Sequence, residues 1–223
     1  PSLNYLGFFG CLSSKPDRES ATKIEDQPTV VVENLTVNGT VYCSEPYAYV
    51  GGLAGRALGK VEIKDCVNDA TISSLARGSA GVGGLIGGYE DGLDYVYWNV
   101  RMTVDGCTNT GLINVTGDNP DAMVGGLVGS NQNCVQIKNS TNTGTINAPG
   151  CTVGGLLGQA GAQTGDYKPS IDADSANTGT LIGAEGKTNA LYGKGYIKDS
   201  GNNTYTPGEV ADVLLLESQK YLD

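Results

Sequence analysis

Residues 125–158 read GGLVGSNQNCVQIKNSTNTGTINAPGCTVGGLLG and contain both halves of a repeat that runs through the chain. The first half is the pentapeptide GGLxG, which is complete at residues 51–55, 83–87, 125–129 and 154–158. A looser copy, LGFFG, lies at residues 6–10, and a decayed copy, NALYG, lies at 189–193. Self-similarity at short intervals is the mark of a repeat architecture, so the chain is expected to stack similar units.

The second half of the repeat is VQIKNSTNTGTI at residues 135–146. Its other copies lie at residues 30–41, 61–72, 102–113 and 170–181. The eighth position is asparagine in four copies, at Asn68, Asn109, Asn142 and Asn177. The tenth position is glycine at Gly39, Gly111, Gly144 and Gly179. The same two elements therefore follow one another five times.

The alternation within this second element is that of short strands. Val135 and Ile137 alternate with polar residues, which is typical of a half-buried strand. The alternation shifts by one before Ile146, so we expect a corner near Asn139. With GGLxG as a third extended segment, each repeat predicts one three-stranded coil. The chain is therefore predicted to be all-β, a right-handed parallel β-helix (β-solenoid) of about five coils, with the asparagines stacked into an internal amide ladder.

The end of the chain has a different pattern. Thr206-Pro207-Gly208-Glu209 resembles a helix N-terminus with proline in the first turn, and apolar residues follow at helical spacing. We predict a short C-terminal helix over residues 207–221. The domain division is then a solenoid over residues 1–205 and a capping or linker helix over 206–223.

Composition excludes several classes of function. The net charge is −10, with 14 basic residues and no histidine. Such a chain repels phosphate, so neither nucleic acid nor lipid headgroups are expected partners. No apolar run reaches the roughly 18–20 residues that span a bilayer, so membrane insertion is not expected. No cofactor, metal site or catalytic residue is predicted. The chain begins at Pro1 without a signal-peptide pattern, and we interpret it as a mature chain or an excised part of a longer one.

The six cysteines show no CxxC pair, which argues against a metal knuckle or a redox motif. Cys66 and Cys107 share one position of the second element, where the other copies carry Ser140, Ser175 and Leu35. A position that accepts cysteine, serine or leucine suggests inward packing. Most of the thiols are therefore expected to be free and buried.

GGLIG, GGLVG and GGLLG resemble the GLUG motif, a short repeat similar to segments of IgA-specific bacterial metallopeptidases and of filamentous-haemagglutinin-like adhesins. The resemblance covers most of residues 6–193 through the repeats. It implies an extracellular or cell-surface β-solenoid region of a bacterial protein, part of a longer chain, without catalytic residues of its own. The zinc-binding HExxH helix of the peptidases cannot occur here because the chain has no histidine.

The candidate binding residues lie where the repeat is interrupted. Long insertions follow Gly10, Gly87 and Gly158, and all five gaps are expected to leave the solenoid at one corner. Insertions on one side of a repeat protein are often its binding face. Tyrosines with carboxylates suit a glycan or a host or surface protein. The candidate ligand-binding residues, all in the middle insertion, are Tyr89, Glu90, Asp94, Tyr95 and Tyr97.

Several interpretations remain open at this point. The aromatic residues of the middle insertion can instead pack that insertion onto the solenoid wall. Glu90, Asp91 and Asp94 offer oxygen ligands for calcium, but no calcium-loop pattern accompanies them. The leading hypothesis is a non-catalytic adhesion or spacer module. The alternative is a carbohydrate-active β-helix enzyme, a glycan hydrolase or lyase, for which Glu62 and Asp65 are weak candidates because their copies are Gln136 and Asn139.

Overall fold

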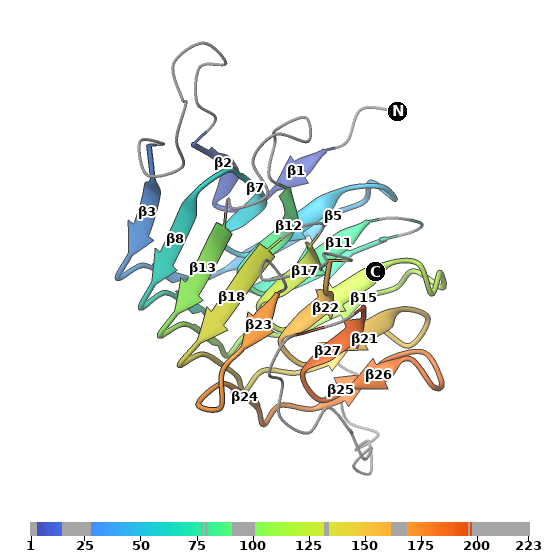
Figure 1. Cartoon of the computed structure of the whole chain (residues 1–223). Helices are drawn as coiled ribbons and strands as arrows, with labels where there is room; N and C mark the ends of the chain where they lie inside the picture. Colours follow the sequence, from blue (N-terminus) through green and yellow to red (C-terminus); the bar gives the residue numbers. More distant parts are fainter. Residues whose placement is uncertain are drawn as a thin grey trace.

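The computed structural model describes residues 4–14, 28–76, 78, 80–90, 101–131, 134–161, 169–195 and 197. Within these residues the chain contains strands and no helix, and it winds as a right-handed parallel β-helix (Figure 1). The predicted fold class is confirmed. The predicted helix at 207–221 and the domain boundary at 205 lie outside the described residues.

Each turn of the β-helix passes through five parallel sheets, numbered here in chain order. Sheet 1 contains β1 (Tyr5–Leu6), β6 (Tyr49–Gly51), β11 (Gly81–Gly83), β16 (Met123–Gly125), β21 (Thr152–Gly154) and β26 (Thr188–Asn189). Sheet 2 contains β2 (Phe9–Ser13), β7 (Ala54–Leu58), β12 (Ile86–Glu90), β17 (Val128–Asn131), β22 (Leu157–Gln159) and β27 (Tyr192–Lys194).

The remaining three sheets have five strands each. Sheet 3 contains β3 (Val30–Glu33), β8 (Val61–Lys64), β13 (Arg101–Asp105), β18 (Cys134–Lys138) and β23 (Ser170–Ile171). Sheet 4 contains β4 (Thr36–Val37), β9 (Val67–Asn68), β14 (Thr108–Asn109), β19 (Thr141–Asn142) and β24 (Ala176–Asn177). Sheet 5 contains β5 (Thr40–Cys43), β10 (Thr71–Ser74), β15 (Ile113–Val115), β20 (Ile146–Asn147) and β25 (Leu181–Ile182).

The number of strands in a coil corrects the prediction from sequence. Three strands were expected, whereas the chain forms five, because both halves of the repeat bend more often than their alternation indicates. GGLxG is divided between sheets 1 and 2, with its bend at Gly52-Leu53 in the second coil. The second element spans sheets 3, 4 and 5. The described chain thus has five coils and the start of a sixth, β26 and β27, as the decayed motif copy predicts.

The corner predicted near Asn139 is present, and its backbone explains the residue choice. Asn34, Asp65, Gly106 and Asn139 occupy the fifth position of the second element, between sheets 3 and 4. Their φ angles are 54°, 49°, 65° and 46°. Asparagine, aspartate and glycine are the residues that enter this left-handed region most readily. Four of the five coils therefore turn this corner with a residue suited to that backbone.

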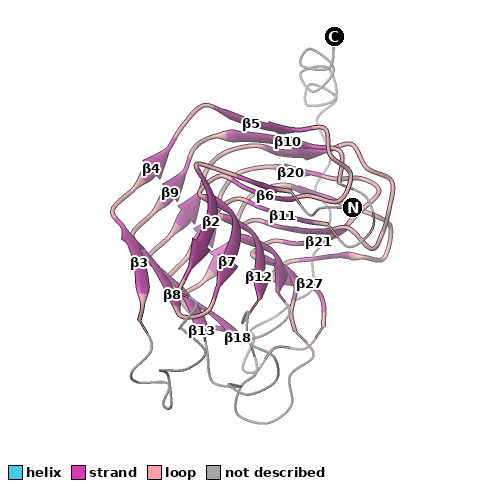
Figure 2. Ribbon diagram, turned by 90° about the horizontal axis from the view of Figure 1, so that it is seen from above, coloured by secondary structure: helices cyan, strands magenta, loops and turns pink. Residues whose placement is uncertain are grey.

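The coil is folded in on itself, and it encloses two cores. Seen along the helix axis, sheet 1 turns sharply into sheet 2, so that the outline has two lobes (Figure 2). One core includes Leu53, Ala57 and Ile63, and the other includes Val50 and Ile72. All five residues are fully buried. Each lobe therefore has its own stack of apolar side chains along the axis.

The glycines of GGLxG allow the close approach at this bend. A β-carbon on the first glycine, for example Gly83, would collide with the carbonyl oxygen of Ile86 across the bend. A β-carbon on the last glycine, for example Gly87, would collide with the backbone of Tyr49 and Val50 in the preceding coil. Both obstacles are main chain, which cannot move aside as a flexible side chain can. The leucine between them, Leu85 in this copy, is fully buried.

The second glycine of the motif packs against the asparagine ladder. A β-carbon on Gly84 would lie 2.7 Å from Oδ1 of Asn109, and Gly52, Gly126 and Gly155 face the asparagines of their own coils in the same way. The asparagines bond along the axis: Nδ2 of Asn68, Asn109 and Asn142 donates to Oδ1 of the next asparagine, each time at 2.7 Å. The predicted internal ladder is confirmed, and it explains why the two halves of the repeat occur together.

Candidate functional site

All five gaps between the two halves of the repeat leave the solenoid at one corner, between sheets 2 and 3. The gaps join β2 to β3, β7 to β8, β12 to β13, β17 to β18 and β22 to β23. In Figure 2 the described ends of these strands gather on one side of the coil stack. The prediction of a single insertion corner is confirmed. The middle gap, between β12 and β13, is the one that carries the candidate ligand-binding residues.

The structure describes two of these five residues. Asp94, Tyr95 and Tyr97 lie outside the described residues, as does Asp91. Glu90 is the last residue of β12, and its backbone pairs with that of Leu58 in the preceding coil. The structure therefore places Glu90 at the start of the middle insertion.

Tyr89 is inside the solenoid, which corrects its assignment to the binding face. Its side chain is fully buried, and its hydroxyl donates a hydrogen bond to the carbonyl oxygen of Gly59 at 3.1 Å. Tyr89 pairs with Ala57 in the preceding coil, so a large side chain lies beside a small one. The prediction was wrong because Tyr89 was grouped with the insertion. It belongs to β12, whose alternation turns it inward.

This placement indicates that Tyr89 contributes to the stability of the fold. Replacing Tyr89 with phenylalanine keeps the ring and removes the hydrogen bond to Gly59, so we expect a loss of about 1 kcal/mol in the free energy of unfolding. The change in the urea midpoint measures it. A stability equal to that of the parent chain, together with loss of a binding activity, would instead return Tyr89 to the binding face.

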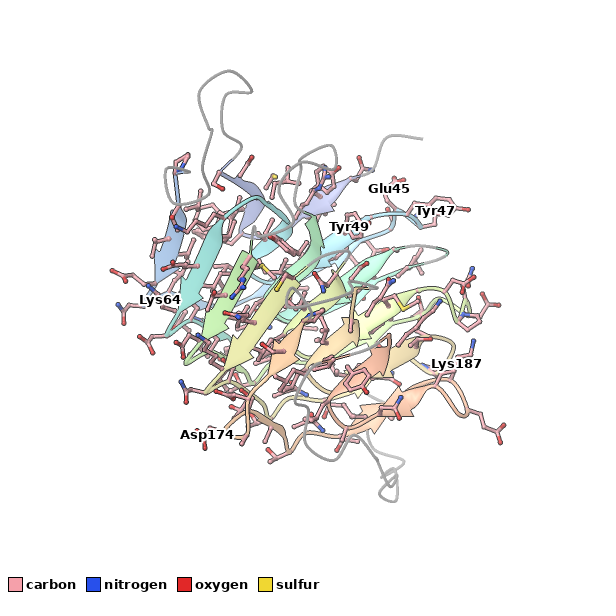
Figure 3. All side chains as sticks on the ribbon, viewed as in Figure 1. Glu45, Tyr47, Tyr49, Lys64, Asp174 and Lys187 are labelled. Carbon is pink, nitrogen blue, oxygen red and sulfur yellow. The ribbon has the colours of Figure 1, made fainter. Side chains whose placement is uncertain are left out.

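The sequence reasoning missed exposed aromatic residues at the N-terminal end of the solenoid. Phe8, Tyr42 and Tyr47 are 63%, 57% and 52% exposed. Tyr47 lies at the outer edge of the coils (Figure 3), where its ring approaches the turn at Gly78. Tyr42 has the outward parity of Thr40 in β5, a signal that was available in the sequence.

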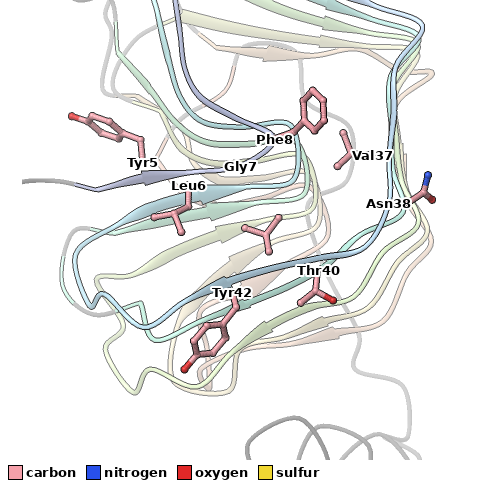
Figure 4. Close-up of a pocket in the computed structure, with 9 residues that line it drawn as sticks. Tyr5, Leu6, Gly7, Phe8, Val37, Asn38, Thr40 and Tyr42 are labelled. Atoms are coloured by element: carbon pink, nitrogen blue, oxygen red, sulfur yellow. The ribbon is translucent and has the colours of Figure 1, made fainter.

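An open hollow of about 420 Å³ lies at the same end, between β1 and β5. Figure 4 shows Leu6 pointing toward the space between the two strands, whereas Thr40 and Tyr42 point away from it. Leu6 and Val41 also pack against the second apolar core. The hollow is therefore the open end of that core, and its inner wall is apolar.

The six thiols all lie among the described residues and form no disulfide. All six are free, and five are buried, which confirms the prediction. Burial raises the pKa of Cys134, and burial raises that of Cys151 to about 11. The hydrogen bond with the Cys66 thiol, together with burial, raises the pKa of Cys107. Raised values keep these three thiols protonated at neutral pH, and a thiol reacts as its thiolate. The same hydrogen bond lowers the pKa of Cys66 to about 7, so it is full burial that shields that thiol from reagents.

This arrangement predicts the pattern of alkylation. In the folded chain, iodoacetamide should modify Cys11, the exposed thiol, and leave the other five unmodified until the chain unfolds. Intact mass before and after addition of urea measures the number of adducts. Rapid addition of a second or third adduct to the folded chain would contradict the burial of these residues.

The usual metal ligands among the described residues are carboxylates and thiols. No cluster of three or more cysteine, aspartate or glutamate side chains is placed to hold a metal ion there. Glu62 accepts a hydrogen bond from Nζ of Lys64 at 2.5 Å on the surface of sheet 3. Among the described residues no helix is long and apolar enough to cross a membrane.

Known proteins share the repeat and the fold. Residues 122–147 match the family described as the GLUG motif. The repeat is the GLUG motif. These residues include the second glycine Gly126 and its ladder partner Asn142, which the structure places in contact. The GLUG match therefore coincides with the packing of glycine on asparagine.

Two longer proteins resemble this GLUG solenoid. Halomucin from Haloquadratum walsbyi is 36% identical over 157 residues, which cover 68% of this chain and 2% of Halomucin. A crystal structure from Bacteroides ovatus, provisionally assigned as an immunoglobulin A1 protease, superposes with a TM-score of 0.55 and 20% identity. The match covers 92% of this chain and 53% of that one. At this identity the second likeness concerns the fold alone.

Proposed function

We propose that this GLUG solenoid is a non-catalytic module of an extracellular, cell-surface protein, serving as a spacer and as an adhesion unit. One observation supports the proposal most strongly: the repeated residues are used by the scaffold itself. The glycines of GGLxG pack on backbone, and the asparagines bond to one another. Recognition would then reside in the insertions, which differ from coil to coil and leave from one corner.

The chemistry of the middle insertion favours a polar partner with flat or apolar faces. Its sequence between β12 and β13, DGLDYVYWNV over residues 91–100, combines aromatic rings with carboxylates. Aromatic rings stack on sugar rings and anchor protein contacts, and carboxylates accept hydrogen bonds from hydroxyl and amide groups. A glycan or a host or surface protein is therefore the proposed partner. The net charge of −10 makes a polyanionic partner unfavourable.

Binding to glycan arrays and to immobilised matrix proteins tests this proposal. Replacing Tyr95 and Tyr97 with alanine should weaken binding at least about tenfold, the usual effect of removing a central aromatic anchor. Tyr42→Ala is the matched control, because Tyr42 is 57% exposed on sheet 5 and away from the insertion corner. Equal losses in both variants, or turnover of a glycan by the parent chain, would contradict the proposal.

A further inference from the structure

The N-terminal end of the solenoid exposes apolar side chains that the other coils bury. Among the described residues, β1 to β5 are the terminal strands of the five sheets. Val61 and Ile72 in the second coil are fully buried, whereas Val30 and Val41 at the same positions of the first coil are half-buried. An edge strand also leaves half of its backbone hydrogen-bonding groups without a strand partner.

The two ends of the stack differ in this respect. In the last full coil, Ile171 and Leu181 are 1% and 3% exposed, whereas Tyr192 in the partial coil beyond it is half-buried. At the N-terminal end, Phe8 is 63% exposed and the hollow between β1 and β5 opens onto Leu6 and Val41. Among the described residues, the larger exposed apolar surface therefore lies at the N-terminal end of the solenoid.

Gly10 indicates what fits on that end. It occupies the position of the last glycine of GGLxG, between Phe9 and Cys11, which pair with Ala54 and Arg56. In the coils below, this glycine is needed because the backbone of the preceding coil lies against it. Among the described residues, a β-carbon on Gly10 would meet only the carbonyl oxygen of Tyr5, at 3.7 Å. Gly10 therefore leaves room for the backbone of an additional coil on the N-terminal side.

A row of alternating charges on sheet 3 indicates which charge an additional coil at this end should carry. Glu33, Lys64, Asp105 and Lys138 lie in register in successive coils, and Asp172 follows Ile171 in the next. Opposite charges directly across a strand pair stabilise a sheet, and like charges destabilise it. The row begins with a carboxylate at Glu33, so a basic residue above it would continue the alternation.

The amide ladder adds a second requirement. Each asparagine donates toward the next coil in the C-terminal direction, and Val37 holds the ladder position in the first coil. An asparagine above Val37 would find no amide oxygen there. A coil placed on this end should therefore carry an apolar residue at that position.

We infer that the N-terminal end of the solenoid is a docking surface for one further coil of the same repeat, continuing the stack in parallel register. That coil carries lysine or arginine above Glu33 and an apolar residue above Val37. A second copy of this chain fits less well, because β23, its last described strand in sheet 3, would place Asp172 over Glu33. This inference does not depend on the binding proposed for the insertion corner.

A chain extended by one coil tests the inference. Tyr5, Tyr49, Met123 and Thr152 share one register, so a copy of residues 123–151 joined directly before Tyr5 should begin a sixth full coil. This copy supplies Lys138 above Glu33, and Asn142→Val in the copy supplies the apolar residue. A matched extension with Lys138→Glu in the copy tests the charge requirement.

Hydrogen exchange and unfolding midpoints provide the readouts. Docking should slow exchange of the β1–β5 amides at least about tenfold, and less in the Lys138→Glu extension. Gly10→Ala should leave the midpoint of the original chain unchanged and lower that of the extended chain. Unchanged exchange, or the same effect of Gly10→Ala in both chains, would overturn the inference. Concentration-dependent dimers of the original chain in sedimentation would also overturn it, because a second copy would then occupy the end.

Discussion

Replacing Gly87 with alanine should lower the free energy of unfolding by about 3 kcal/mol or more, at the upper end of overpacking effects. A β-carbon at Gly87 would meet the carbonyl oxygen of Gly55 at 2.6 Å and the backbone of Tyr49 at 2.7 Å. The obstacles are main-chain atoms of paired strands, so relief requires that sheet 1 and sheet 2 move apart. Urea unfolding followed by circular dichroism measures the loss.

Gly10→Ala is the matched control, since Gly10 has the same motif position without a coil above it. Among the described residues, the nearest atom to its β-carbon is the carbonyl oxygen of Tyr5, at 3.7 Å. Alanine there should be neutral or stabilise the chain by a few tenths of a kcal/mol, about what reduced freedom of the unfolded backbone contributes. Similar losses at both glycines would show that backbone conformation, and not the neighbouring coil, makes this glycine necessary.

Replacing Asn109 with alanine should cost about 4 kcal/mol, because it interrupts the middle of the amide ladder. Asn109 is fully buried and accepts from Asn68 while donating to Asn142 and to the carbonyl oxygen of Gly111. The substitution leaves these buried groups without partners and opens a cavity beside Gly84. The urea midpoint should fall with little change in the slope of the transition.

Asn177 is the control for the ladder. It accepts from Asn142 and donates to the carbonyl oxygen of Gly179, but it is only half-buried, so water can replace its bonds. Asn177→Ala should therefore cost about 1 kcal/mol. If Asn109→Ala were as mild as this, the amide ladder would contribute little to stability, and the apolar cores would have to account for the stack.

The repeat itself was enough to predict the scaffold. Recurrence of GGLxG and of the asparagine position indicated stacked parallel coils, and alternation about Asn139 located a corner correctly. These features are visible because stacking places the same position of every coil in the same surroundings. A position such as that of Leu53 or Asn109 then repeats its chemistry in sequence.

The shape of the coil was harder to predict from the sequence. Sheet 1 bends into sheet 2 within two residues, and strands as short as β9 (Val67–Asn68) show no alternation of their own. The reason for the second glycine also lies far away in sequence, since Gly84 packs on Asn109 from the following sheets. Only the closed coil brings these two residues together.

The position of the candidate site was predictable from the sequence, but the residues that belong to it were not. Spacing between the repeats located the insertion corner, because every gap occurs after the same strand. Tyr89 was misassigned because the last residues of a strand and the first of an insertion share the same sequence character. The exposed Tyr42 was not predicted as a candidate, because the prediction considered the insertions and Tyr42 lies within a regular copy of the repeat.

The through-space contacts of the asparagine side-chain amides test the stacked-coil account most directly. Nuclear Overhauser effects should link the Nδ2 hydrogens of Asn68, Asn109, Asn142 and Asn177 in one unbroken series, with slow solvent exchange at the three buried members. Such a series requires parallel coils in the register described. Rapid exchange of these amides, or contacts that skip or reorder the series, would contradict it.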